Sequence, residues 1–166
     1  MSTAKIAVYA GSFDPVTLGH LDLIKRATRL FDRIIVAVGK NPNKKHMFSD
    51  VERVDMINTA LRSEEETRKH HVEVTVFDDF LVDYAEKMDA VTLIRGLRTG
   101  SDLDSELGMV FTNRRINDKV DTIFLTPKEE YGFVSSSVVR ELIGLGADVN
   151  TLAKFIPESV FDYIEE

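Results

Sequence analysis

The segment Lys5–Gly39, KIAVYAGSFDPVTLGHLDLIKRATRLFDRIIVAVG, holds two short apolar runs on either side of an amphipathic stretch. The runs, Lys5–Ala10 and Arg33–Gly39, are almost continuously apolar and rich in β-branched residues. That composition is typical of strands that a parallel sheet buries on both faces. Between them, apolar residues recur at three- and four-residue spacing from Leu21 to Phe31, as on one face of a helix. The segment therefore predicts a strand–helix–strand unit.

The same alternation continues along the chain. Further strands are predicted at Val72–Phe77, Ala90–Ile94 and Asp121–Leu125, and further helices at Val54–Leu61, Val82–Lys87, Asp102–Arg115, Val138–Leu145 and Glu158–Glu165. Ser49 and Glu52 form a capping-box pattern ahead of the first of these helices, and the charged stretch Arg62–His71 is interpreted as a solvated loop. Strands alternating with helices predict a doubly wound α/β fold around a five-stranded parallel sheet. With no repeat, linker or compositional break, residues 1–166 are interpreted as a single domain.

Composition excludes several classes of protein. The 166 residues contain no cysteine, which excludes disulfides, thiolate metal sites and a cysteine nucleophile. The net charge of −7 argues against wholesale binding of nucleic acid unless basic residues gather in one patch. No apolar run approaches the ~20 residues of a membrane span, and the N-terminus lacks a signal-peptide pattern. We therefore expect a cytoplasmic protein that binds neither membranes nor nucleic acid.

Ligands of doubly wound sheets bind beyond the carboxyl ends of the strands. The loop after the first strand reads GSFDPVTLGH, Gly11–His20, and the chain contains neither G-x-G-x-x-G nor G-x-x-x-x-G-K-[ST]. Nicotinamide-dependent hydride transfer and P-loop chemistry are thereby excluded. Gly19 allows a ligand to approach the backbone at a helix start, where anions are favoured, and His20 would direct a hydrogen-bond donor at a phosphate. The other histidines, His46, His70 and His71, are interpreted as surface residues, and no metal-ligand pattern is recognised.

The loop sequence resembles the nucleotidyltransferase signature G-[ST]-F-D-P-x-[TH]-x-G-H. Three further motifs follow: NPNKK at Asn41–Lys45, RGLR at Arg95–Arg98 and VSSSVVR at Val134–Arg140. In this order and at these distances they resemble the bacterial phosphopantetheine adenylyltransferases over nearly the whole chain. Relatives that adenylate nicotinate mononucleotide share the first and last motifs but generally lack the third. The resemblance implies a Rossmann-like nucleotidyltransferase fold.

The resemblance also implies site residues. Catalysis is assigned to His20, Lys44 and Arg95, and acceptor binding to Ser12, Lys44, Leu81 and Arg95. ATP binding is assigned to Ser12, Phe13, His20, Gly96, Leu97, Arg98, Glu106, Tyr131, Gly132, Phe133, Val134, Ser135, Ser136 and Ser137.

Several of these residues have simpler interpretations. The lysines of the NPNKK turn can merely be solvated, an arginine at a strand end can form a structural ion pair, and one serine before a helix can be only its cap. Two guanidinium groups on one loop nevertheless suit phosphate oxygens, and three consecutive serines exceed what a cap requires. Ser105 stands where family members usually carry an aromatic residue, which affects local packing or subunit contacts.

The implied reaction transfers AMP from ATP to 4′-phosphopantetheine and yields dephospho-coenzyme A and pyrophosphate. Mg²⁺ is implied as the partner of the ATP phosphates, although no carboxylate cage is recognisable. Family members are homohexamers that can bind coenzyme A. Two alternatives remain at this point: a related adenylyltransferase for another acceptor such as nicotinate mononucleotide, and a non-catalytic sensor of adenine nucleotides.

Overall fold

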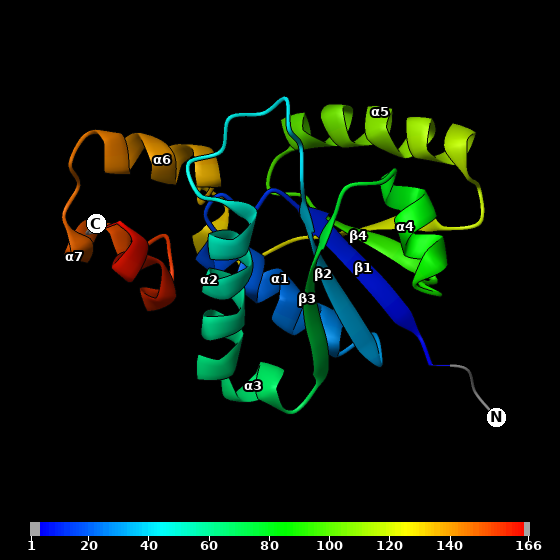
Figure 1. Cartoon of the computed structure of the whole chain (residues 1–166), viewed down its shortest axis with the longest axis horizontal. Coiled ribbons are helices and arrows are strands. Elements are labelled where there is room, and N and C mark those ends of the chain that lie inside the picture. Colours follow the sequence, from blue (N-terminus) through cyan, green and yellow to red (C-terminus); the bar gives the residue numbers. More distant parts are fainter. Residues whose placement is uncertain (1–3, 165–166) are drawn as a thin grey trace.

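A computed structural model describes residues 4–164 (Figure 1). Its centre is a parallel sheet of five strands in the order β3-β2-β1-β4-β5. The strands are β1 (Ile6–Gly11), β2 (Arg33–Gly39), β3 (His71–Phe77), β4 (Thr92–Gly96) and β5 (Asp121–Leu125). All five strands predicted from the sequence are present within two residues of their expected ends, and the predicted doubly wound architecture is confirmed.

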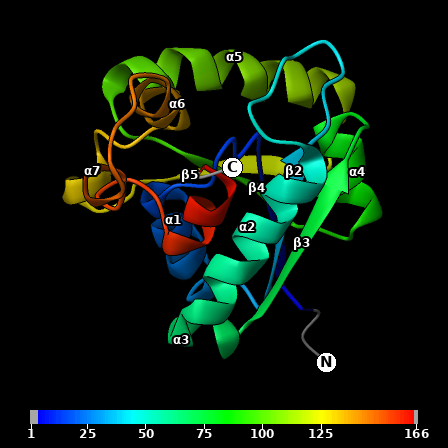
Figure 2. The same ribbon diagram turned by 60° about the vertical axis from the view of Figure 1, so that its left-hand side comes forward.

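Helices cover both faces of the sheet (Figures 1 and 2). They are α1 (Leu18–Thr28), α2 (Asp50–Ser63), α3 (Glu65–Arg68), α4 (Leu81–Lys87), α5 (Gly100–Ile116), α6 (Ser136–Gly144) and α7 (Val149–Leu152), with 3₁₀ turns η1 (Glu129–Tyr131) and η2 (Glu158–Tyr163). The helices α4 and α5 lie on one face, and α1, α2, α6 and α7 pack together on the other side. Within residues 4–164, no helix is long and apolar enough to cross a membrane.

The central strands are buried on both faces, which explains their continuous hydrophobicity. In β1, Ala7 and Tyr9 belong to the core beneath α1 and α2, whereas Val8 and Ala10 belong to the core beneath α4. Alternate residues of β2 divide between the two cores in the same way. A strand with two buried faces has no polar positions to alternate with apolar ones.

The strand order reverses between β1 and β4: the sheet grows from β1 toward β3 on one side and from β4 toward β5 on the other. From β1 the chain passes through α1 to β2 on one side, and β4 pairs with the other edge of β1. In open α/β sheets such a switch point opens a crevice at the carboxyl ends of the strands. The loops that follow β1 and β4 therefore form the two walls of the expected site.

Three expectations from the sequence are wrong. The stretch Arg62–His71 is not a loop throughout, because α2 continues to Ser63 and α3 follows, with buried Thr67 donating its hydroxyl to the Leu61 carbonyl. The predicted helix Glu158–Glu165 is a 3₁₀ helix, Glu158–Tyr163, and its last residue lies outside the described residues.

The third concerns His46. Its side chain is 12% exposed and faces Asp14, with Nδ1 at 3.5 Å from Oδ2. His46 is therefore not a surface residue. His70 and His71 are exposed, as expected.

Candidate active site

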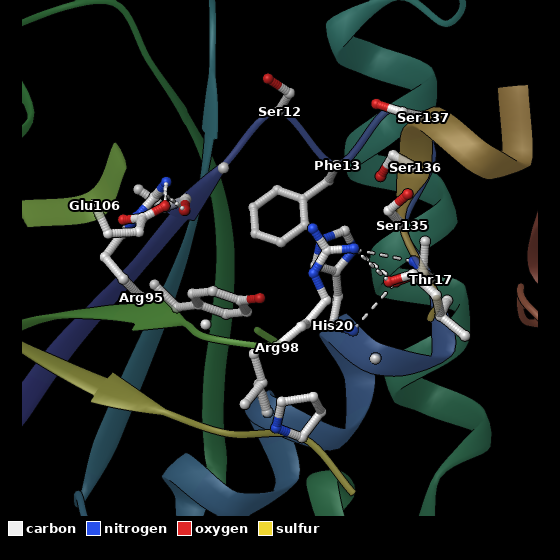
Figure 3. Close-up of a pocket in the computed structure, with 18 of the residues that line it drawn as sticks. Ser12, Phe13, Thr17, His20, Arg95, Arg98, Glu106, Ser135, Ser136 and Ser137 are labelled. Atoms are coloured by element: carbon white, nitrogen blue, oxygen red, sulfur yellow. Dashed lines mark hydrogen bonds and ion pairs between the residues drawn. The ribbon is translucent and has the colours of Figure 1, made fainter. Parts of the chain in front are cut away.

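A pocket of about 290 Å³ opens at the switch point, between the loops after β1 and β4 and the start of α6 (Figure 3). Predicted site residues that line it are Ser12, Phe13, His20, Lys44, Arg95, Gly96, Arg98, Glu106, Val134, Ser135, Ser136 and Ser137. These residues come from four separate segments of the sequence. The fold therefore brings most of the predicted site together in one cavity.

The pocket concentrates positive charge in an acidic protein. Its lining contains the four cations Lys44, Arg95, Arg98 and Arg140 and one carboxylate, that of Glu106. The chain as a whole carries −7. Cations gathered in a concave site raise the local concentration of anionic ligands and direct them to it. The electrostatics of the pocket thus fit a ligand rich in phosphate.

The imidazole of His20 is held in one orientation by the helix cap beside it. The backbone N–H of Thr17, the N-cap of α1, donates to His20 Nδ1 at 3.0 Å. In return the amide of His20 donates to Thr17 Oγ1 at 3.3 Å. Because Nδ1 accepts a hydrogen bond, the neutral ring carries its proton on Nε2. His20 therefore offers an N–H donor on the side of the ring away from the cap (Figure 3).

The surroundings of His20 keep this ring neutral. Burial, followed by the positive charges of Arg98 and Arg95, lowers the pKa of His20 to about 4. Each of these causes disfavours the imidazolium form. At neutral pH the ring is therefore an uncharged donor and has no proton to give up as an acid.

Phe13 supports His20 from the floor of the pocket. Its ring meets the His20 ring edge-on with a centroid separation of 4.9 Å, and it meets Tyr9 in the same way at 5.3 Å. Phe13 adopts a positive φ of 48°, and its side chain is almost fully buried. A Cβ on Gly11 would lie 3.3 Å from this ring, so a small residue suits that position.

Arg95 and Glu106 form a bidentate ion pair on one wall. Nε and Nη2 of Arg95 donate to the two carboxylate oxygens of Glu106 at 2.7 and 2.8 Å, and Nη1 donates to the Ala10 carbonyl at 2.8 Å. The structural ion pair considered for Arg95 is thus present. Three of the five N–H groups of a guanidinium are used in this way, so two remain for a ligand. The pair also fixes the plane of the guanidinium at the end of β4.

The remaining residues of the RGLR motif extend from this wall toward the start of α6. A Cβ on Gly96 would lie 2.6 Å from Leu23 Cδ1, so any larger residue where β4 meets α1 would force the buried Leu23 side chain to shift. Arg98 donates to the Val134 carbonyl at 3.2 Å and pairs with Asp102, with Nε 3.4 Å from its carboxylate. Arg98 therefore links the loop after β4 to the segment that precedes α6.

The three serines have three different roles. Ser135 is the N-cap of α6 and accepts from the amide of Val138 at 3.2 Å. The hydroxyl of Ser136 donates to the Pro15 carbonyl at 2.8 Å, and Ser137 accepts from Arg140 at 3.2 Å. The Ser136 contact joins the start of α6 to the first loop, whereas the Ser137 contact lies within α6. A second helix N-terminus, besides that of α1, thus faces the pocket, and such ends favour anions.

Lys44 reaches the pocket from the loop between β2 and α2. Its Nζ lies 3.3 Å from Ser12 Oγ, which places the ammonium group at the mouth of the cavity beside the first loop. The predicted acceptor-binding residues Lys44 and Ser12 therefore adjoin each other, and Arg95 lines the same pocket from the end of β4.

Five predicted residues lie outside the pocket lining. Leu97 donates its amide to the Leu125 carbonyl, Leu81 packs against the core beneath α4, and Phe133 is 87% exposed. Tyr131 ends the 3₁₀ turn η1, and Gly132 follows it before α6. Their assignment to ligand binding stays a prediction.

Sequence reasoning missed three residues that organise the site. Thr17 orients His20, and Arg140 lines the pocket and donates to the Asp14 carbonyl at 2.6 Å. Arg53 is 2% exposed, and its Nη1 donates to the Ser12 carbonyl at 2.6 Å and to the Gly39 carbonyl at 3.2 Å. Thr17 and Arg140 stand inside the quoted motifs, whereas Arg53 resembles any charged residue of an amphipathic helix.

Comparisons with known proteins agree with this geometry. Residues 8–142 match the cytidylyltransferase-like family. The phosphopantetheine adenylyltransferase of Vesicomyosocius okutanii is 44% identical over 156 residues, 94% of each chain. That of Campylobacter hominis is 43% identical and covers 96% of this chain and 95% of its own. The chain belongs to the phosphopantetheine adenylyltransferase family.

Structures of nucleotidyltransferases share the fold of this family member. The nicotinic acid mononucleotide adenylyltransferase of Plasmodium falciparum, complexed with NaAD, aligns with a TM-score of 0.72 at 21% identity. The alignment covers 98% of this chain and 95% of that one. At this identity the likeness concerns the fold alone.

Nucleotidyltransferases that use ATP generally need a divalent metal. Within residues 4–164, no three His, Cys, Asp or Glu side chains gather into a metal site. The only carboxylate lining the described pocket, that of Glu106, is engaged by Arg95. The residues present therefore fit a cation that arrives with the phosphates of a nucleotide and retains water ligands, and they do not form a cage of protein oxygens.

Proposed function

We propose that this protein transfers the adenylyl group of ATP to 4′-phosphopantetheine and releases dephospho-coenzyme A and pyrophosphate. The observation that carries the proposal is the pocket at the switch point. It combines a neutral His20 donor with two sets of cations: Lys44 and Arg95 beyond the ends of β2 and β4, and Arg98, which contacts the segment before α6. Two groups of cations suit two phosphorylated substrates.

The reaction needs no covalent intermediate with the protein. An oxygen of the acceptor phosphate forms a bond to the α-phosphorus of ATP while the bond from that phosphorus to the bridging oxygen breaks. Pyrophosphate leaves with the electron pair. The protein contributes orientation of the two phosphates and stabilisation of the charge that develops between them.

Each group of the pocket has a place in this step. Lys44, Ser12 and Arg95 hold the acceptor phosphate, while Arg98 and the start of α6 hold the ATP phosphates. Nε2–H of His20 donates to the α-phosphate, where negative charge is redistributed in the transition state. An uncharged donor suits this role, because its proton stays in place throughout the transfer.

Mg²⁺ is proposed as the divalent ion, bound through the ATP phosphates. When bound there, it would neutralise part of their charge and would make pyrophosphate a better leaving group. Mg²⁺ commonly binds through substrate phosphates and water in this way.

The decisive experiment measures pyrophosphate release with ATP and a panel of acceptors: 4′-phosphopantetheine, pantetheine and nicotinate mononucleotide. Release with 4′-phosphopantetheine alone supports the proposal. Preference for nicotinate mononucleotide supports the related adenylyltransferase, and binding of ATP without release from any acceptor supports the sensor.

The family resemblance extends to assembly and regulation. A homohexamer and inhibitory binding of coenzyme A are proposed on that ground, as is a cytoplasmic location. The helix α5 supports the assembly, because it leaves Leu103, Met109 and Phe111 exposed and, of its residues, buries only Val110. Sedimentation and competition by coenzyme A against ATP test these two points.

A further inference from the structure

Asp14 is a buried carboxylate that the proposed transfer does not use. It stands in the first loop, and its side chain is 3% exposed. Its two oxygens accept from consecutive backbone amides of another loop: Met47 N–H donates to Oδ2 and Phe48 N–H to Oδ1, each at 2.9 Å. A carboxylate can accept on both oxygens at once, whereas an amide side chain can accept on one only.

These two bonds fasten the end of the loop that carries Lys44. The loop leaves β2 at Gly39 and enters α2 at Asp50, and Lys44 stands three residues before Met47. The side chain of Phe48 is buried in the core beneath α2, so the far end of the loop is fixed. Asp14 thereby links the position of Lys44 to the first loop, which also supplies Ser12, its hydrogen-bond partner.

A cation from a further element lies near the charge of Asp14. Arg140 Nη1 of α6 lies 3.9 Å from Oδ2, and the His46 ring of the anchored loop packs beside the same oxygen, with Nδ1 at 3.5 Å. Arg140 also donates to the main-chain carbonyl of Asp14 at 2.6 Å. A buried carboxylate persists only with such partners, which indicates that this position is built for a charge.

We propose that Asp14 is a positioning residue for the acceptor phosphate. It holds the loop between β2 and α2 so that the Lys44 ammonium stays at the pocket mouth. The assignment of the acceptor phosphate to Lys44 rests on the proposed function, whereas the anchoring of the loop does not. Asp14 does not line the pocket, and its effect on the reaction passes through Lys44.

The variant Asp14→Asn tests the proposal with little change in size. It loses one charge-assisted bond to the loop while the main-chain contact with Arg140 remains. We expect the acceptor KM to rise about tenfold, with the ATP KM within about twofold of wild type. In a Lys44→Ala background the same substitution should raise the acceptor KM by less than about twofold, because the group that it positions is already absent.

Asp22→Asn is the matched control. Asp22 is also a buried carboxylate, but it accepts from the Lys128 amide and from Arg26 Nε, both at 2.9 Å, on the other side of α1. It should not change the acceptor KM. If both variants raise the acceptor KM equally, or if Asp14→Asn adds its full effect to Lys44→Ala, Asp14 is merely structural and the proposal is overturned.

Hydrogen exchange provides a readout that does not depend on activity. In the wild type, the amides of Met47 and Phe48 should exchange at least about tenfold more slowly than those of Lys45 and His46, which have no acceptor within residues 4–164. Asp14→Asn should abolish that difference. Fast exchange at Met47 and Phe48 in the wild type overturns the anchoring, even if the variant does not fold. Slow exchange in a protein that does not use 4′-phosphopantetheine overturns the proposed function only.

Discussion

Two substitutions of His20 can test the roles of its two ring nitrogens separately. The structure assigns Nδ1 to the Thr17 cap and leaves the proton on Nε2 for a ligand. Asparagine places its amide near the Nδ1 position, so His20→Asn keeps a partner for the cap and loses the donor. Glutamine reaches the Nε2 position, so His20→Gln keeps a donor.

The loss of the donor should appear in kcat. Removal of one preorganised donor to a developing charge lowers kcat by about 10²–10³, or roughly 2.7–4 kcal/mol. We expect this loss for His20→Asn, with the ATP KM within a few-fold of wild type, because Arg98 and the start of α6 still hold the phosphates. His20→Gln should retain at least about tenfold more activity than His20→Asn, since it restores the donor that this mechanism requires.

Steady-state measurements of pyrophosphate release, with the concentrations of both substrates varied, separate the effect on kcat from the effect on the ATP KM. Thermal unfolding of each variant provides the control, and the midpoints of the two variants should agree within a few degrees. Near-wild-type turnover of His20→Asn would refute the reasoning. Equal loss in both variants would show that the position of the ring matters, and that the Nε2 donor does not.

The remaining predictions concern charge, space, metal and pH. Lys44→Ala and Arg95→Ala should each raise the acceptor KM about tenfold or more, with less effect on the ATP KM, and their combined effect should fall short of additivity; an effect on ATP alone contradicts the acceptor assignment. Gly96→Ala should lower stability by about 1–3 kcal/mol through overpacking against Leu23, and the same substitution should cost less in a Leu23→Ala background, where the contact is gone; chemical denaturation of the double-mutant cycle measures both. Chelation of divalent ions should abolish turnover and leave the unfolding midpoint unchanged, because no protein cage holds the ion; a large drop would indicate a structural metal. The ring of His20 should titrate near pH 4 in nuclear magnetic resonance of the free protein. Since its pKa is lowered on folding, it reduces stability as the pH falls from about 6.5 toward 4, by about 2 kcal/mol at pH 5, and His20→Gln should lack this loss.

The strands could be predicted because their signal is local. Each is a short apolar run bounded by polar residues, and burial on both faces leaves no competing periodicity. The short helices α3 and α7 could not be predicted, because their four residues are fewer than two turns and each buries a single side chain. The assignment of one domain to residues 1–166 stays a prediction. The order of the strands in the sheet could not be predicted from local sequence patterns, since it depends on pairing between distant segments.

Much of the candidate site could be predicted for a different reason. Parallel strands bring their carboxyl ends to one edge, so motifs that follow strands converge there even when they are far apart in sequence. What could not be predicted is how the charged side chains pair. The Arg95–Glu106 bond joins β4 to α5, and only coordinates show that three N–H groups of Arg95 are already engaged. The burial of His46 is hidden in the same way, because it depends on the position of Asp14 in another loop.

The length of the first motif follows from the number of elements that it joins. Ser12 meets Lys44 and Arg53, Asp14 accepts from the loop before α2, and the Pro15 carbonyl accepts from α6. Thr17 begins α1 and orients the catalytic candidate of the same segment. Three positions of this stretch thus hold partners on other elements, Ser12 and Pro15 in part through their main-chain carbonyls and Asp14 through its carboxylate. The first loop therefore does more than line the pocket, because it also fastens the loop before α2 and the start of α6, which complete the lining.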